Sequence, residues 1–292
     1  MVKMSLGAAF SETFTFLRTN WMQMLLWLGG AVVVACVLGW LLLRNSMGAM
    51  MMAQGGDPSA AFGALGSFFL FAFIAGTIVF AASLLIWRTG LVGGEPASDV
   101  GWGLGAGAAY MLAMIVVYFA TIIAMYIVLL LVGLLAFAVF GASGMSLESL
   151  ATGGASVGLI FFGVLIYIAI IIFFLWFFGR LSVAGPIMAV TRSANPFSAF
   201  AESWRMTGAS QWTIVGFNLL MGILFIVFIF VVSLLLGSVT GAMMTPGAGA
   251  GSMIGGLIAA LLIYVPSVLV SVSMPAGVYR SISTKAGSDV FA

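Results

Sequence analysis

The chain has 292 residues, of which 64% are hydrophobic and only 5% are charged. Soluble domains carry roughly 45–50% apolar and about 25% charged residues. Nine basic and seven acidic side chains are too few to cover a folded chain of this length in water, so its surroundings must be mostly lipid. The composition excludes a soluble protein and predicts an integral membrane protein.

Residue counts also exclude several kinds of chemistry. The chain has no histidine, which removes a histidine general base, a haem ligand and a histidine-containing metal site. Cys36 is the only cysteine, so neither an internal disulfide nor a thiolate cluster can form. A G-x-S-G sequence at 141–144 is also found in six-span rhomboid proteases, but Ser143 has no histidine to take its proton. We predict no enzymatic activity, no cofactor and no metal.

Six stretches are apolar enough, over about 20 residues each, to cross the hydrocarbon core of a bilayer as helices. They are residues 21–43, 64–87, 104–132, 157–178, 212–236 and 253–279. We predict an all-α integral membrane protein, a bundle of six transmembrane helices that forms a single membrane domain over residues 1–292.

The basic residues predict the orientation of these spans. With the N-terminus inside, only Arg44 falls on the outer side. The other eight fall on the cytoplasmic side: Lys3, Arg18, Arg88, Arg180, Arg192, Arg205, Arg280 and Lys285. Because short loops follow the positive-inside rule, we expect both termini to be cytoplasmic.

Two stretches outside the spans predict amphipathic helices at the cytoplasmic surface of the membrane. Over residues 5–20 and into the first span, one stripe carries Leu6, Phe10, Phe14, Leu17 and Trp21, with Glu12 on the opposite side. Over residues 196–207, Asn195 and Pro196 predict the N-cap and first position of a second helix. Phe197, Phe200 and Trp204 share one face of that helix, and Glu202 opposes them.

The two surface helices resemble each other. The sequence AFSETF at 9–14 aligns with AFAESW at 199–204, and a tryptophan opens the span that follows each of them. Each unit then ends in an aromatic–arginine pair, at 87–88 and 279–280. We predict a parallel internal duplication of surface helix plus hairpin, with a third hairpin between the two copies. Chance similarity between low-complexity membrane segments is the alternative.

Glycine and proline mark sites of close packing. Gly101, Gly103, Gly105 and Gly107 form two staggered G-x-x-x-G pairs, which predict close approach between helices rather than a nucleotide-binding loop. Pro266, within the sixth span, predicts either a packing kink or a break in the helix that exposes backbone carbonyls to a solute.

The most informative polar region lies between residues 180 and 205. Arg180, Arg192 and Arg205 are expected near the lipid headgroups, where arginine binds phosphate through two hydrogen bonds. Three residues separate Glu202 from Arg205, so these two side chains can instead pair with each other, or with Glu12 and Arg18. The simpler alternative is that these arginines only set the membrane topology and anchor the helices at the surface.

The same region resembles a known family. Its pattern is Arg180 and Pro186, followed by Ala199, Ser203, Trp204 and Thr207 on a short helix before a span. This pattern is similar to bacterial six-span proteins related to the membrane domain of some glycerophosphodiester phosphodiesterases, and to stand-alone relatives of unknown function. The resemblance implies a membrane module of the bacterial inner membrane, without the soluble domain that performs hydrolysis in the fused relatives.

These observations predict a non-enzymatic inner-membrane protein that engages lipid or serves as an accessory or assembly subunit of a membrane complex. Its expected partners are membrane lipids and other membrane subunits or further copies of itself, and not nucleic acid. The alternative is an uncoupled transporter or channel for a small apolar or amphipathic solute. No charged residue lies near the middle of any predicted span, which argues against a coupled ion transporter.

Overall fold

The computed structural model describes residues 3–53, 58–141, 157–243 and 250–288, and these residues are almost entirely helical. Ser143 lies outside the described residues. The helices, in chain order, are α1 (Leu6–Ala53), α2 (Pro58–Val92), η1 (Pro96–Asp99), α3 (Val100–Gly141), α5 (Val157–Leu181), α6 (Ala184–Thr191), α7 (Pro196–Thr207), η2 (Gly208–Ser210), α8 (Gln211–Met243) and α9 (Ala250–Ser288).

Six of these helices are long and apolar enough to span a membrane. Each predicted span lies within one of them: α1, α2, α3, α5, α8 and α9. A helix satisfies its backbone hydrogen bonds internally, which hydrocarbon demands because it offers no partner. The prediction of an all-α fold is therefore confirmed for the described residues, and the six candidate spans indicate a multi-pass membrane protein.

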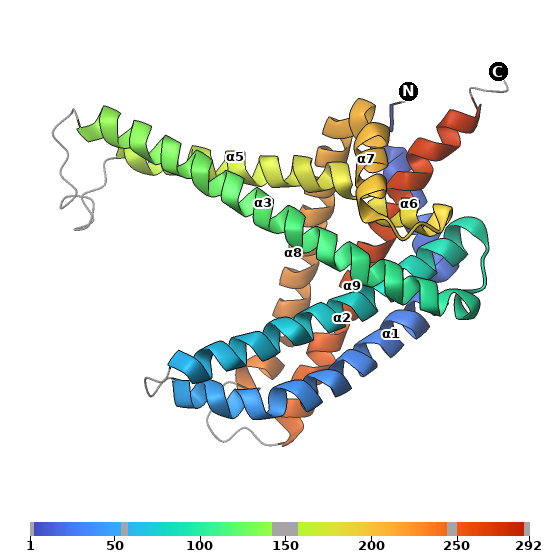
Figure 1. The fold of residues 1–292 in the computed structure, drawn as a ribbon, viewed down its shortest axis with the longest axis horizontal. Helices are drawn as coiled ribbons and strands as arrows, with labels where there is room; N and C mark the ends of the chain where they lie inside the picture. The colour runs from blue at the N-terminus through green and yellow to red at the C-terminus, as the bar shows by residue number, and fades with distance from the viewer. Residues whose placement is uncertain (1–2, 54–57, 142–156, 244–249, 289–292) are drawn as a thin grey trace.

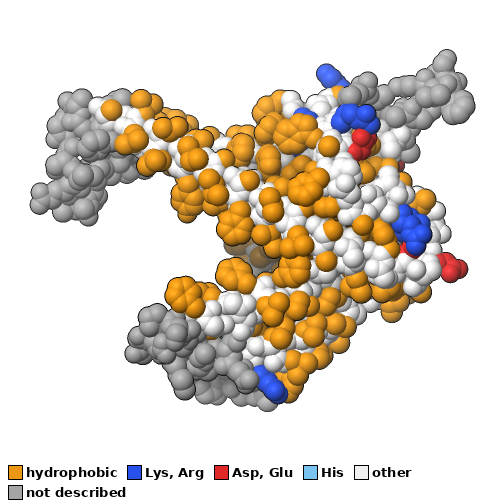
Figure 2. Space-filling view, in the orientation of Figure 1, with side chains coloured by type: hydrophobic (Ala, Val, Ile, Leu, Met, Phe, Trp, Pro, Cys, Tyr) orange, Lys and Arg blue, Asp and Glu red, His pale blue; other side chains and the backbone are white. Residues whose placement is uncertain are grey.

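The helices radiate from a common end of the molecule, which we call the hub (Figure 1). The hub comprises the C-terminal ends of α2, α5 and α9, the first turns of α1, α3 and α8, and the short helices α6 and α7. From it, the hairpin of α1 and α2 and the pair α3 and α5 run out as separate arms, and a hollow lies between them (Figure 2). The six predicted helices are present, but they do not form one closed bundle, because α3 and α5 run apart from the hairpin of α1 and α2 while α9 packs on α1.

Lipid explains why the arms can separate. Apolar side chains gain little by leaving hydrocarbon for a protein interior, so helices associate in membranes mainly where small or polar residues meet. The outer part of α3 and α5 carries large exposed apolar side chains such as Leu130, Leu134 and Phe161. The charged side chains in view gather mostly on the hub, whereas the arms are largely apolar (Figure 2).

The first surface helix is not separate from the first span. Residues 6–53 form one helix, because nothing between Arg18 and Trp21 interrupts it. Its buried stripe is Ala9, Thr13, Phe16, Asn20 and Met24. The predicted apolar stripe is divided: Phe14 and Trp21 are about half exposed, whereas Phe10 and Leu17 are partly buried against the core.

The second surface helix, α7, forms as a separate element with the predicted cap. The Asn195 side chain accepts hydrogen bonds from the backbone N–H groups of Phe197 (3.1 Å) and Ser198 (3.3 Å), and Pro196 begins the helix. The preceding helix, α6, ends at Arg192, which adopts the left-handed conformation (φ 52°). This corner turns the chain sharply and places α7 against the end of α5.

One of the two glycine pairs lies at a helix interface. A Cβ added to Gly107 would lie 2.9 Å from the Thr77 carbonyl oxygen of α2, and one added to Gly103 would lie 3.3 Å from a Leu85 methyl carbon. Gly101 and Gly105 have nothing within 4 Å of that position. Residues two apart lie about 200° apart around a helix, so the second pair faces away from α2.

This difference gives a matched pair of variants. Gly107→Ala is expected to destabilise the protein by about 1–3 kcal/mol, because the new methyl group meets the backbone of α2. Gly105→Ala is expected to be neutral or to stabilise by up to about 1 kcal/mol through helix propensity. Reversible unfolding in mixed micelles measures both. Equal effects of the two variants would show that α3 does not pack on α2 in this register.

Candidate functional site

The hub holds most of the charged residues that the structure describes, and they form three separate clusters. Each cluster connects elements that are far apart in the sequence. The first centres on Arg180 at the end of α5, the second on Asp99 in η1, and the third on Arg280 near the end of α9.

Arg180 lies inside the hub, with only 8% of its surface exposed. Its guanidinium donates to Gln211 Oε1 (2.9 Å) and to the backbone carbonyl of Trp204, and it stacks on the Trp204 ring at 4.4 Å. Trp176 Nε1 donates to the same Gln211 oxygen at 3.1 Å. Arg180 therefore connects α5, α7 and α8 through one cation.

The backbone of Arg180 takes part as well. Ser203 Oγ donates to the Arg180 carbonyl oxygen at 2.7 Å, and Thr207 Oγ1 lies 3.3 Å from the same oxygen. The Ser203 hydroxyl satisfies a carbonyl near the end of α5 that has no partner further along its own helix, whereas Thr207 Oγ1 makes its shorter bond, 2.7 Å, to the Ser203 carbonyl oxygen. The predicted position of Arg180 among lipid headgroups is therefore wrong for its side chain, since burial and these contacts hold it within the protein.

Asp99 is the centre of the second cluster. It is 5% exposed and pairs with Arg88 at the end of α2 and with Arg192 Nη2 (2.9 Å) after α6. Arg88 Nη1 also donates to the carbonyl oxygen of Ala189 at 3.0 Å. A buried carboxylate needs such partners because its desolvation is costly. Arg192, predicted to face lipid, thus holds Asp99, although about half of its side chain stays exposed.

The third cluster joins the two ends of the chain. Arg280 Nη2 donates to the Gly90 carbonyl oxygen at 2.7 Å, and Arg280 lies 5.4 Å from the Phe16 ring centre. Its Nη1 lies 4.0 Å from Glu12 Oε2, which is a loose ion pair. The partner of Glu12 is therefore Arg280, and not an arginine of α7 as the sequence allowed.

Two of the predicted arginines, Arg18 and Arg205, remain on the surface. Arg205 Nη2 lies 2.7 Å from Glu202 Oε2, so these residues form the i, i+3 pair that was one of the sequence alternatives. Arg18 on α1 is exposed. Arg205 is 69% exposed in its side chain. Among the predicted basic residues, Arg18 and Arg205 are thus the most available to a ligand.

Four residues of the hub were not predicted from sequence as site residues: Asp99, Arg88, Gln211 and Trp87. Trp87 Nε1 donates to the Val272 carbonyl oxygen at 2.7 Å and joins α2 to α9. One signal was available for Asp99: it is an acidic residue directly before a long apolar run, where a free carboxylate would be unfavourable. The identity of its partners depends on the three-dimensional fold.

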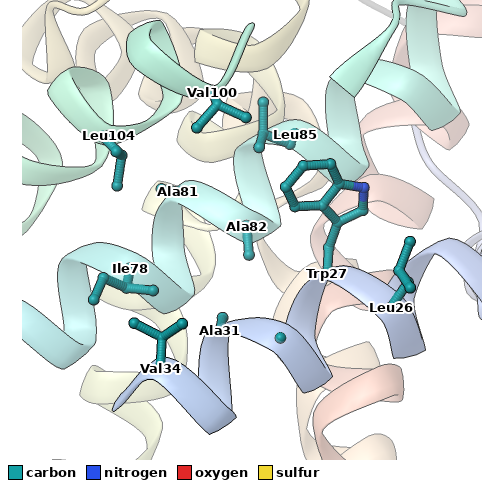
Figure 3. A pocket seen from close by; sticks show the side chains of 11 residues that line it. Leu26, Trp27, Ala31, Val34, Ile78, Ala81, Ala82, Leu85, Val100 and Leu104 are labelled. Atoms are coloured by element: carbon teal, nitrogen blue, oxygen red, sulfur yellow. The ribbon is translucent and has the colours of Figure 1, made fainter. Parts of the chain in front are cut away.

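The arms and the hub also contain cavities. One of them, about 460 Å³, is an apolar crevice between α1, α2 and α3 that is lined by Trp27, Ile78, Leu85 and Leu104 (Figure 3). A cavity of about 140 Å³ lies beside Pro266, between α1, α8 and α9, and is also apolar. These spaces suit hydrocarbon better than a polar solute.

The polar side chains of the hub mostly contact one another and backbone carbonyls. Among the residues that the structure describes, no group of three His, Cys, Asp or Glu side chains is placed to hold a metal ion. The arginines and carboxylates of the hub bind one another and backbone carbonyls, and the exposed pair on α7 remains accessible.

Comparison of the chain with protein-family models, with curated proteins and with solved structures finds no match. The resemblance to membrane domains of phosphodiesterases therefore remains a prediction. Its residues do come together in the hub: Arg180 contacts Ser203, Trp204 and Thr207, while Ala199 and Pro186 are buried nearby.

Proposed function

We propose that this protein is a non-enzymatic membrane module that binds phospholipid at its hub, in the inner membrane of a bacterium. The observation that carries the proposal is the division of the hub arginines. Arg180 and Arg88 are held inside by protein contacts, whereas Arg18 and Arg205 remain exposed beside apolar surface. Exposed arginine next to apolar side chains is the arrangement that anchors a phospholipid headgroup above its chains.

Exposed aromatic residues support this placement. Phe14 and Trp21 lie on the outer face of α1 near Arg18, and Phe197 and Trp212 flank α7 near Arg205. Aromatic side chains concentrate where hydrocarbon meets headgroups. Together with the excess of basic residues at this end of the molecule, they favour a cytoplasmic hub with both termini inside.

The proposed duplication has support from corresponding contacts. Ser203 on α7 bonds to the end of α5, and Thr13, its counterpart in the aligned sequences, packs closely on Gly277 near the end of α9. In both places an amphipathic helix lies against the C-terminal end of a long helix, although α5 precedes α7 in the chain and α9 follows α1. We propose that the two units descend from one hairpin with its surface helix.

The proposal is tested by the lipid that the purified protein retains. In native mass spectrometry with phosphatidylglycerol, Arg18→Gln combined with Arg205→Gln is expected to lower retention at least about fivefold, because each basic residue near anionic lipid contributes about 1 kcal/mol. Arg44→Gln makes the same change at the far end of α1 and serves as the control. Unchanged retention in the double variant would refute lipid binding at the hub.

The same measurement addresses the accessory-subunit version of the proposal. After mild extraction from the source membrane, a mass far above one or a few chains would identify a partner complex. The apolar arms, exposed along α3 and α5, offer the surface that such a partner would cover. A single chain with reproducible lipid masses would favour lipid binding alone.

A transporter is the second candidate, and the cavity beside Pro266 is the observation that favours it. A proline within a helix leaves the carbonyl four residues earlier without its backbone donor. Transport through this region requires the cavity to open to both sides of the membrane. Accessibility of single cysteines placed at Met221 and Val270 to a water-soluble thiol reagent, in the C36S background, tests this requirement.

A further inference from the structure

A second cavity in the hub, of about 450 Å³, lies between α6, α7 and the end of α9. Its polar lining consists of Thr191, Ser193, Ser198, Glu202 and Tyr279. None of the three ion-pair and hydrogen-bond clusters described above fills it. Among the residues that the structure describes, Glu202 is the one charged side chain that lines it, and that side chain is about one-third exposed.

Two of the hydroxyl groups of this cavity, those of Thr191 and Ser198, have committed their protons and can accept hydrogen bonds. Thr191 Oγ1 donates its proton to the Ile187 carbonyl oxygen at 2.8 Å, and Ser198 Oγ donates to the Asn195 carbonyl oxygen at 2.9 Å. Once these protons are committed, the lone pairs of both oxygens remain for a donor. With the Glu202 carboxylate, the cavity offers acceptors and negative charge, which suits a cation that carries N–H groups.

A guanidinium lies directly beside this acceptor set. Arg205 Nη2 is 2.8 Å from Glu202 Oε1 and 2.7 Å from Oε2, and most of the Arg205 side chain projects into the surroundings. The site therefore presents a carboxylate in a cavity and a cation at its rim. A zwitterion with an ammonium and a phosphate a few bonds apart has the complementary arrangement of charge.

We propose that this cavity binds the phosphoethanolamine headgroup, with its primary ammonium on Glu202 and its phosphate on Arg205. The proposal rests on the function proposed above, because it names the lipid class that the hub prefers. The exposed Phe197 and Trp212 near α7 place the cavity at headgroup depth. In the bound state, the Glu202–Arg205 pair is exchanged for two ion pairs with the ligand.

The chemistry discriminates among common headgroups. A primary ammonium donates three hydrogen bonds, whereas the quaternary ammonium of choline donates none and leaves the acceptors of the cavity unpaired. A glycerol headgroup lacks the cation altogether. Because Glu202 is partly exposed, solvent moderates the preference, and we expect about fivefold rather than a larger ratio.

The test is lipid competition on the full-length protein. In native mass spectrometry with equimolar phosphatidylethanolamine, phosphatidylcholine and phosphatidylglycerol of identical acyl chains, wild type is expected to retain the ethanolamine lipid about fivefold over the choline lipid. Glu202→Gln should bring this ratio close to one, and Tyr279→Phe should lower it in part. Glu95→Gln removes a carboxylate of the hub that does not line the cavity, and it should leave the ratio unchanged.

The outcomes separate this proposal from the previous one. Equal retention of ethanolamine and choline lipids, or an ethanolamine preference that survives Glu202→Gln, overturns the cavity assignment. If the cavity assignment fails in this way but phosphatidylglycerol retention still depends on Arg18 and Arg205, the proposed lipid binding at the hub holds without a preference for ethanolamine. If soluble glycerophosphoethanolamine displaces the lipid, the headgroup alone is the ligand. If it does not displace the lipid while the ethanolamine preference persists, the ligand is the whole membrane lipid.

Discussion

Arg180→Met is expected to lower the free energy of unfolding by about 3 kcal/mol. The substitution keeps much of the side-chain volume but leaves the Gln211 oxygen and the Trp204 carbonyl without the cation that binds them. The hydroxyls of Ser203 and Thr207 still reach the Arg180 carbonyl, so the variant isolates the contribution of the guanidinium.

Two comparisons make this result specific. Arg180→Lys keeps the charge but not the planar group that stacks on Trp204 and contacts two acceptors, so it should fall between wild type and Arg180→Met. Arg205→Met removes an exposed arginine and should change stability by less than about 0.5 kcal/mol. Unfolding in mixed micelles gives all three values. Similar losses for Arg180→Met and Arg205→Met would mean that Arg180 does not join the three helices.

Gly277→Ala is expected to have the largest effect, a loss of more than about 3 kcal/mol or a failure to accumulate folded protein. An added Cβ would lie 2.6 Å from both Cα and N of Thr13, so the backbone of α1 would have to move. Because α1 and α9 carry the two ends of the chain, this movement would also disturb the contact of Arg280 with Gly90.

Gly222→Ala is the matched control. Gly222 lies within α8, and a Cβ there has nothing within 4 Å. Alanine favours a helix over glycine by up to about 1 kcal/mol, so this variant should be neutral or more stable. Thermal unfolding of the two purified variants, with yield as a second readout, compares them. Equal stability of Gly277→Ala and wild type would contradict the close contact of α1 with α9.

The membrane spans could be predicted from sequence because hydrocarbon imposes a simple condition. Any uncharged, apolar run of sufficient length meets it, whatever its neighbours are. The cap of α7 was equally predictable, since Asn195 and Pro196 act on backbone atoms within three residues. Local rules of this kind depend on no distant part of the chain.

The pairing of the charged residues could not be predicted in the same way. Arg280 bonds to Gly90 across 190 positions, and Trp87 bonds to Val272 across 185. Local sequence does not show that Arg180, at the end of α5, is buried in the hub while Arg205, on α7, is exposed. Only the packing of α6 and α7 on the ends of the spans separates the two cases.

The separation of arms from hub has a consequence for how the sequence is free to change over evolution. Along the arms, contact with lipid requires only that the helices be long and apolar. Leucine, isoleucine, valine and phenylalanine can therefore replace one another there with little effect on stability. In the hub, Arg180, Asp99 and Gly277 meet specific atoms of distant segments. Relatives of this protein should therefore diverge rapidly in their arms and remain recognisable by a few scattered hub positions.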